Sequence, residues 1–111
     1  MTYDNENIFA KILRSEIPCE KIFENEYIFS FKDINPKAKF HILIIPKKPY
    51  IDVLDFLENA DADFQSNFWI SVNKIISQLD LKNKGFQIKT HKGKDGGQEV
   101  FHFHLHLLSD S

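Results

Sequence analysis

The spacing of apolar residues along the chain predicts two helices. In residues 5–14, the apolar positions 8, 9, 12 and 13 fall on one face of a short helix. Between about residue 61 and residue 79, apolar residues recur at steps of three and four, as in an amphipathic helix: Phe64, Phe68, Val72, Ile75, Ile76 and Leu79. Asp61 or Asp63 can cap the start of this second helix, because a short acidic side chain accepts hydrogen bonds from the free N–H groups there.

Short runs of β-branched and aromatic residues between turn residues predict β-strands elsewhere. These runs occupy residues 19–23, 27–31, 41–45 and 86–90, and the histidine-rich residues 100–108 form a fifth. The connections are short, which favours antiparallel neighbours. Because no linker or repeat divides the sequence, we expect residues 1–111 to form a single α+β domain with two helices and about five strands.

Histidines alternate with apolar residues in the last predicted strand. Successive side chains of a strand point to opposite faces, so His102, His104 and His106 are expected on one face. The other face then carries positions that pack into the core: Phe101, Phe103, Leu105 and Leu107. Same-face neighbours on a strand lie roughly 6.6 Å apart. Three groups that titrate near neutral pH therefore share one small patch.

Composition and charge narrow the class of protein. The 111 residues are 42% hydrophobic, which suffices for a core, although a chain this short often gains buried area by forming a homodimer. A net charge of -2 argues against binding nucleic acid through bulk charge. Cys19 is the only cysteine, so no internal disulfide is expected. The first residues lack the order of a signal peptide, and no apolar run approaches the ~20 residues that span a bilayer. We therefore expect a cytoplasmic protein without a membrane partner.

Three interpretations of the histidine patch are open at this point. Individual histidines can be structural and satisfied by hydrogen bonds. They can instead bind a metal such as zinc, although the only nearby carboxylate is Glu99, whose strand parity places it on the other face. The third interpretation is chemistry on a phosphate, in which a neutral imidazole attacks phosphorus and its neighbours donate protons. His104 has a histidine on each side and is the natural nucleophile.

A glycine-rich loop at residues 92–98 leads directly into the histidine segment. Gly93, Gly96 and Gly97 permit positive φ and close backbone approach, and such loops can aim several N–H groups at an anion. Hairpins between strands also use glycine, so the loop alone does not show that this segment binds an anion. Its position before the histidines favours a shared phosphate site, to which Lys92 and Lys94 would add positive charge.

Residues 102–108, His-Phe-His-Leu-His-Leu-Leu, fit the His-x-His-x-His-x-x signature of the histidine triad superfamily. Further segments resemble its Hint branch: residues 7–12, 16–18, 31–36, 41–48 and 95–98. The resemblance extends from about Asn7 to Leu108. It implies a homodimer of five-stranded antiparallel sheets with two helices each. It also implies hydrolysis of purine nucleoside 5′-phosphoramidates through a nucleotidyl-histidine that releases AMP or GMP, with no metal cofactor.

The resemblance also implies roles for individual residues. His104 matches the nucleophile, with its Nδ1 donating to the carbonyl of His102. His106 matches a residue that contacts phosphate and the leaving group, and His41 matches a histidine that supports the cluster. Asp33 matches the residue that binds ribose hydroxyls. Apolar walls around the base correspond to Ile8, Phe9, Ile12, Phe31 and Ile34, and phosphate contacts correspond to His91, Gly97, Gln98 and Val100.

The sequence departs from the Hint pattern at several of these positions. His91 replaces the usual Asn beside the α-phosphate, and Glu99 replaces a Ser or Thr near the leaving group. An ionised Glu cannot donate a hydrogen bond and repels phosphate, but it can favour a cationic leaving group. Asn7, Ala10 and Pro49 stand where bacterial relatives carry ligands of a structural zinc, so no metal site is expected there.

Three alternatives to phosphoramidate hydrolysis follow. The changes at His91 and Glu99 are compatible with a nucleotide-binding or adaptor protein of weak activity. A dinucleoside polyphosphate hydrolase, from a neighbouring branch of the superfamily, is the second alternative. A metal-dependent protein is the third.

Overall fold

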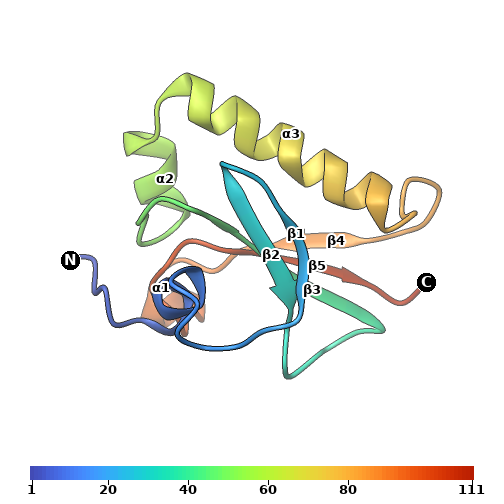
Figure 1. The fold of residues 1–111 in the computed structure, drawn as a ribbon, viewed down its shortest axis with the longest axis horizontal. Helices are drawn as coiled ribbons and strands as arrows, with labels where there is room; N and C mark the ends of the chain where they lie inside the picture. Colours follow the sequence, from blue (N-terminus) through green and yellow to red (C-terminus); the bar gives the residue numbers. More distant parts are fainter.

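One antiparallel sheet organises the fold, and the computed structural model describes all of residues 1–111. Its strands are β1 Lys21–Glu24, β2 Ile28–Lys32, β3 Phe40–Pro46, β4 Gln87–Lys89 and β5 Leu105–Ser109. They lie in the order β1-β2-β3-β5-β4, and every neighbouring pair is antiparallel (Figure 1). The predicted α+β class and five-stranded antiparallel sheet are confirmed.

Three α-helices accompany the sheet. They are α1 Ile8–Leu13, α2 Val53–Asn59 and α3 Ala62–Gln78, and a short 3₁₀ helix, η1, covers Lys94–Gly96. Each α-helix begins after a capping side chain that accepts a backbone N–H: Asn7, Asp52 and Asp61. Of the two candidate caps for the long helix, Asp61 is therefore the cap. None of the helices has the length and apolar character that a membrane crossing requires.

The expectation of two helices is wrong, because α2 is a third. Phe56 is the only buried residue of its seven, so this segment shows no repeating apolar stripe. The signal that marks its start is Asp52, whose Oδ1 accepts the Asp55 N–H at 2.8 Å. A single cap before a weakly periodic segment does not by itself predict a helix.

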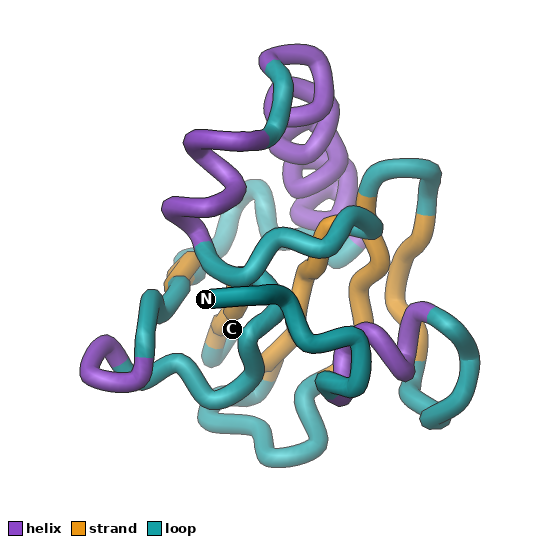
Figure 2. The backbone as a smooth tube through the Cα atoms, turned by 90° about the vertical axis from the view of Figure 1, so that its left-hand side faces the viewer, coloured by secondary structure: helices purple, strands orange, loops and turns teal.

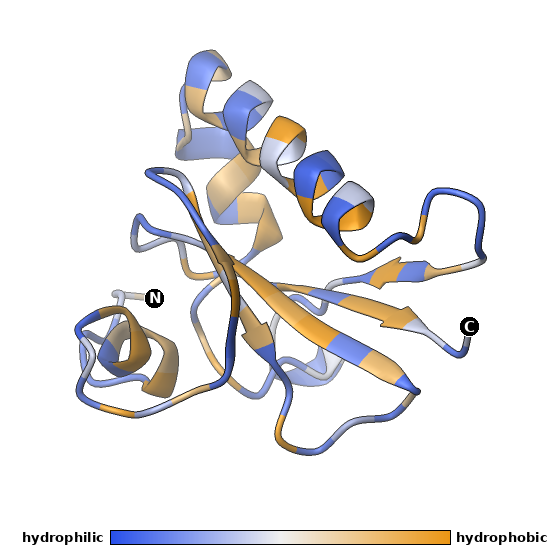
Figure 3. Ribbon diagram, turned by 45° about the vertical axis from the view of Figure 1, so that its right-hand side comes forward, coloured by the Kyte–Doolittle hydropathy of each residue, from blue (hydrophilic) through white to orange (hydrophobic).

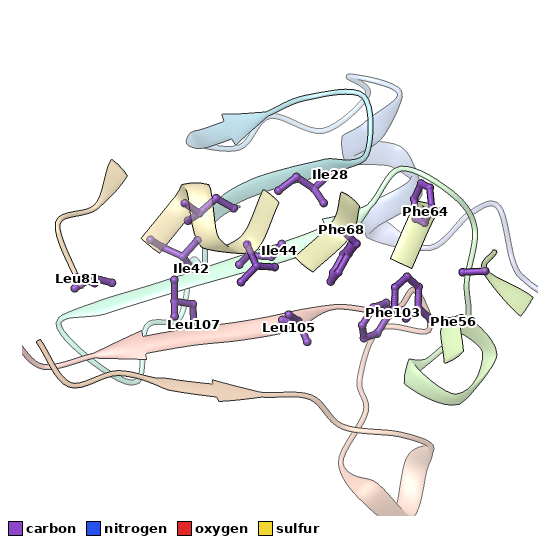
Figure 4. Close-up of a cluster of buried hydrophobic side chains, with 13 residues drawn as sticks. Ile28, Ile42, Ile44, Phe56, Phe64, Phe68, Leu81, Phe103, Leu105 and Leu107 are labelled. Atoms are coloured by element: carbon purple, nitrogen blue, oxygen red, sulfur yellow. The ribbon is translucent and has the colours of Figure 1, made fainter. Parts of the chain in front are cut away.

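The main core lies between the sheet and helices α2 and α3. It contains 13 buried residues, ten of which are labelled in Figure 4. Three phenylalanines from distant parts of the chain meet at one end of it. The ring of Phe103 lies 4.8 Å from that of Phe56 and 5.5 Å from that of Phe68, measured between centroids. This cluster joins the histidine segment to both helices.

Strand β3 is buried on both faces of the sheet. Ile42 and Ile44 belong to the main core, whereas Leu43 and Ile45 belong to a second cluster that includes Phe9 of α1. This alternation follows from the two-residue period of a strand. Figure 3 shows hydrophobic colour running along the central strands and hydrophilic colour on most connecting loops. Helix α1 spans only 6 residues and so leaves part of the second face uncovered.

Only part of the predicted histidine strand is a strand. Residues 100–104 lie outside the ladder, and β5 begins at Leu105. The reason is that the Phe103 N–H donates to the carbonyl of Tyr50 at 2.7 Å, in a loop, and not to a neighbouring strand. Phe103, Leu105 and Leu107 reach the main core as expected, but Phe101 does not. Burial does not alternate, because His102 and His104 are buried as well.

Replacing Phe103 by alanine is expected to destabilise the fold by about 3–5 kcal/mol, because it leaves a cavity among the phenylalanine rings. Urea unfolding measures the loss. Ile34→Ala serves as the control, since Ile34 is 87% exposed and its removal should change the free energy of unfolding by less than about 0.5 kcal/mol. Equal stability of the two variants would contradict the assigned core.

Candidate active site

His102 is held on both ring nitrogens and is fully buried. Its Nε2 lies 2.9 Å from the carbonyl oxygen of Pro46, and its Nδ1 lies 2.6 Å from the hydroxyl of Tyr3. A carbonyl can only accept, so Nε2 carries the proton and Nδ1 accepts the Tyr3 O–H. Because neither nitrogen is left free, His102 anchors the site and is not available to attack a substrate.

His104 presents one free nitrogen. Its Nδ1 lies 2.7 Å from the main-chain oxygen of His102, and this carbonyl also requires the proton to be on Nδ1. Nε2 therefore keeps its lone pair. The edge of the ring meets Phe9 at 4.9 Å between centroids, at an interplanar angle of 90°. The arrangement matches the hydrogen bond implied by the family resemblance and leaves Nε2 as the reactive atom.

His41 and His106 form a second hydrogen-bonded pair with a defined direction. The Lys37 N–H donates to His41 Nδ1 at 2.9 Å, so the proton of His41 is on Nε2. That Nε2 lies 2.9 Å from His106 Nδ1 and 3.3 Å from a carboxylate oxygen of Asp33. His106 Nδ1 therefore accepts, and the proton of neutral His106 is on its Nε2. The His106 ring lies 5.1 Å from that of His104, which places a donor beside a nucleophile.

Asp33, His41 and His106 also form a cluster of potential metal ligands. One ligand atom from each lies within 4.8 Å of the others. No spacing in the sequence marks these three residues as a metal site, because Asp33 and His41 approach His106 only through the folding of the chain. A hydrogen bond already joins the two ring nitrogens, so a cation bound here would have to replace its proton.

A cleft of about 640 Å³ opens over these groups. One side is apolar and comes from α1, β2 and β3: Ile8, Phe9, Ile12, Phe31 and Leu43. The glycine-rich loop and the residues that flank it also line the cleft, through His91, Gly97, Glu99 and Val100. In Figure 2, α1 and the short helix η1 lie on opposite sides of the view. His104 and His106 line the cleft as well, together with His41 and Asp33.

Gln98 and His102 are the two candidate site residues that do not line this cleft. The amide nitrogen of Gln98 donates to the carbonyls of Ile51 and Val100, and its oxygen accepts the Gly93 N–H at 2.8 Å. Gln98 therefore holds the loop in shape from within. Ile34 does line the cleft but is 87% exposed, so it lies at the mouth and not in the wall.

Comparison with known proteins identifies the family. The HIT domain model matches residues 14–111. The chain belongs to the HIT-domain family. An uncharacterized HIT-like protein of Rickettsia prowazekii is 42% identical over 106 residues, which cover 96% of this chain and 88% of that protein.

Solved structures agree with this assignment. A HIT family hydrolase from Clostridium thermocellum superposes with a TM-score of 0.85 and 35% identity, covering 96% of this chain and 91% of that one. A histidine triad protein from Clostridium difficile superposes with a TM-score of 0.87 and 36% identity, covering 99% of this chain and 95% of that one. This HIT domain therefore has the fold of proteins that include hydrolases.

Several residues of this HIT domain reach the site without a signal in the sequence. Tyr3 precedes the segment that resembles the family, and Lys37 contributes only a backbone N–H, which any residue other than proline supplies. Glu99 corrects an expectation: strand parity placed it away from the histidines, but it lines the cleft. Parity does not apply to Glu99 because the chain becomes a strand only at Leu105.

Burial favours the neutral form of the three histidines in residues 102–106 of the HIT site. Loss of solvation lowers the pKa of His102 to about 4 and that of His106 to about 4. It also lowers the pKa of His104, while the carboxylates of Asp33 and Glu99 act on it in the opposite direction. A neutral His104 is the form whose Nε2 can attack.

An NMR titration of the ring signals should show His102 and His106 becoming protonated near pH 4, well below the ordinary value of about 6.5. The unfolded chain takes up these protons near pH 6.5, so it binds more protons than the folded chain between these values. Stability should therefore fall as the pH drops from 6.5 towards 4, by about 1.4 kcal/mol per pH unit for the buried His102. A His102 midpoint near pH 6.5 would show that its ring is solvated.

Proposed function

We propose that this HIT-domain protein hydrolyses purine nucleoside 5′-phosphoramidates and releases AMP or GMP. One observation carries the proposal: His104 lines the cleft with Nδ1 already bonded to a carbonyl, so Nε2 is the nitrogen that meets a substrate. A fixed tautomer and a free lone pair are what a nucleophilic imidazole needs. The similarity to a HIT family hydrolase supports hydrolysis as the reaction class.

The lining of the cleft suits the two parts of a nucleotide. The apolar side accepts a purine ring, with Phe9 and Phe31 in contact at 5.5 Å between centroids. Asp33 offers a carboxylate to ribose hydroxyls at the border of this apolar side. The phosphate then lies by His104 and His106, near His91, Gly97 and Val100. Gln98 contributes through the loop that it braces.

The proposed reaction has two steps. His104 Nε2 bonds to phosphorus while the P–N bond breaks, and the electron pair of that bond stays on nitrogen. The nitrogen receives the Nε2 proton of His106 and departs as an amine. Water then adds its oxygen to phosphorus, its proton returns to His106, and the bond to His104 breaks to release the nucleoside monophosphate. No metal cofactor takes part in this scheme.

His104→Ala is expected to abolish AMP release from adenosine 5′-phosphoramidate, by at least about 1,000-fold, because it removes the atom that attacks. AMP affinity, measured by calorimetry on the same variant, should change little and serves as the control for folding. Turnover by the intact protein should persist in excess chelator.

Other results of that assay separate the alternatives. Release by His104→Ala would refute the nucleophile, and release lost on chelation would point to a metal at Asp33, His41 and His106. AMP binding without turnover would indicate a binding or adaptor protein. Turnover of diadenosine tetraphosphate in preference to the phosphoramidate would indicate a dinucleoside polyphosphate hydrolase.

We also propose that the protein acts as a homodimer that pairs through β4. This strand lies at the edge of the sheet, and Phe86 and Ile88 beside and within it are 38% and 40% exposed. An edge strand with exposed apolar residues is a template for pairing with a second copy. Trp69 and Ile70 of α3 are also exposed, at 44% and 52%.

Sedimentation equilibrium should give twice the chain mass at micromolar concentration. Ile88→Glu is expected to shift the mass towards the monomer, because it places a charge on the pairing edge. Ile34→Glu is the matched control. It places the same charge at another exposed residue, in the loop between β2 and β3 and not on the edge strand, so it should leave the mass unchanged. A monomer mass for the intact protein would refute the dimer.

A further inference from the structure

Glu99 is an unpaired carboxylate in the wall of the cleft. Glu99 is exposed and lines the same cleft as His104 and His106. None of the ion pairs in the protein includes it: the nearby Lys92 lies 3.9 Å from Asp52, and Lys32 pairs with Glu20. The negative charge of Glu99 interacts with the His104 ring, because it acts against the lowering of the His104 pKa by burial. A free negative charge beside a phosphate site costs binding energy unless something positive meets it.

The position of Glu99 restricts what that positive group can be. The apolar side of the cleft and Asp33 lie towards α1 and β2, and under the proposed function they hold the nucleoside. Glu99 is not one of these groups: it follows η1 by three residues and lines the cleft together with His91 and Gly97 of the glycine-rich segment. If the nucleoside lies on the apolar side, as the proposed function has it, the substrate group left to meet the glycine-rich segment and Glu99 is the one beyond the phosphorus, which is the leaving group.

We propose that Glu99 selects leaving groups that carry positive charge, such as a diamine or a basic amino-acid amide, and disfavours anionic ones. The inference rests on the proposed function and names its substrate class more narrowly. Glu99 has two effects of the same sign: it stabilises the amine nitrogen as that nitrogen gains a proton, and it attracts a second ammonium group on the same leaving group. An acyl or polyphosphate leaving group departs with negative charge and would be repelled.

The other charges around the cleft do not cancel this effect. Lys37 and Lys89 line both the cleft and a neighbouring hollow around Gly85 and Asp110. Lys89 pairs in register with His106 across β4 and β5, so under the proposed function it lies on the His106 side of the phosphate. The nucleotidyl-histidine ring also gains positive charge near Glu99. That charge is the same for every leaving group, so it drops out of a comparison between substrates.

The test uses three AMP phosphoramidates of similar length. The amine is 1,3-diaminopropane for the cationic substrate, butylamine for the neutral one and β-alanine for the anionic one. Each is assayed for kcat/KM with the intact protein, with Glu99→Gln and with Asp95→Asn. Asp95→Asn removes one negative charge from the same loop at a position that does not line the cleft. The affinities of the three conjugates are measured in parallel on His104→Ala, with and without Glu99→Gln.

We expect the intact protein and Asp95→Asn to prefer the cationic over the anionic substrate by roughly tenfold, which about 1.4 kcal/mol of Coulomb energy produces. Glu99→Gln should reduce this ratio to less than about threefold, and added salt should reduce it in the intact protein. A ratio unchanged by Glu99→Gln, or no preference in the intact protein, would overturn the inference.

Failure of the proposed function has a different signature, because then none of the three conjugates is turned over by the intact protein. The affinities on His104→Ala still decide the inference in that case. A preference for the cationic conjugate that Glu99→Gln removes supports it, and equal affinities for the cationic and anionic conjugates refute it.

Discussion

The hydrogen bond from His104 Nδ1 to the main-chain oxygen of His102, 2.7 Å long, is the interaction on which the candidate site depends. It fixes both the ring orientation and the tautomer of His104, and so decides which nitrogen is free. The acceptor stays in place because the His102 ring is held by Tyr3 from the chain start and by Pro46 at the end of β3. The buried side chain of His102 thus fixes the position of its own backbone oxygen, and this oxygen orients the reactive ring of His104.

Backbone groups also set the direction of the other histidines. The Lys37 N–H determines the tautomer of His41, and His41 in turn determines that of His106. The result is one free lone pair on His104 and one free N–H on His106, side by side in a cleft. Burial lowers the pKa of His104 and of His106, which favours the neutral rings that this pattern of donors and acceptors requires.

The two faces of the sheet have different roles: one packs in the main core, and the other forms the candidate site. Its first face is covered by α3 and α2 over the main core, which also anchors the histidine segment through Phe103. Its second face is covered only in part by the short α1, and the uncovered part is the cleft. Strand β3 serves both faces, since Ile42 and Ile44 pack in the main core while Leu43 lies in the second cluster and lines the cleft. The acidic and basic groups around this cleft then decide which ligands it can hold.

The sequence by itself determined much of this protein, because regular elements follow from periodic patterns. The spacing of Phe64, Phe68 and Val72 predicted α3, and alternation around His104 predicted a polar patch backed by core residues. The glycines predicted a loop beside it. Only the tertiary structure decided the rest: that α2 is a helix, that Tyr3 binds His102 and that Asp33 meets His41. It also decided between strand parity, which placed Glu99 away from the histidines, and the family resemblance, which placed it near the leaving group. These features depend on contacts between residues far apart in the chain or on a local departure from regular geometry, and neither leaves a periodic trace in the sequence.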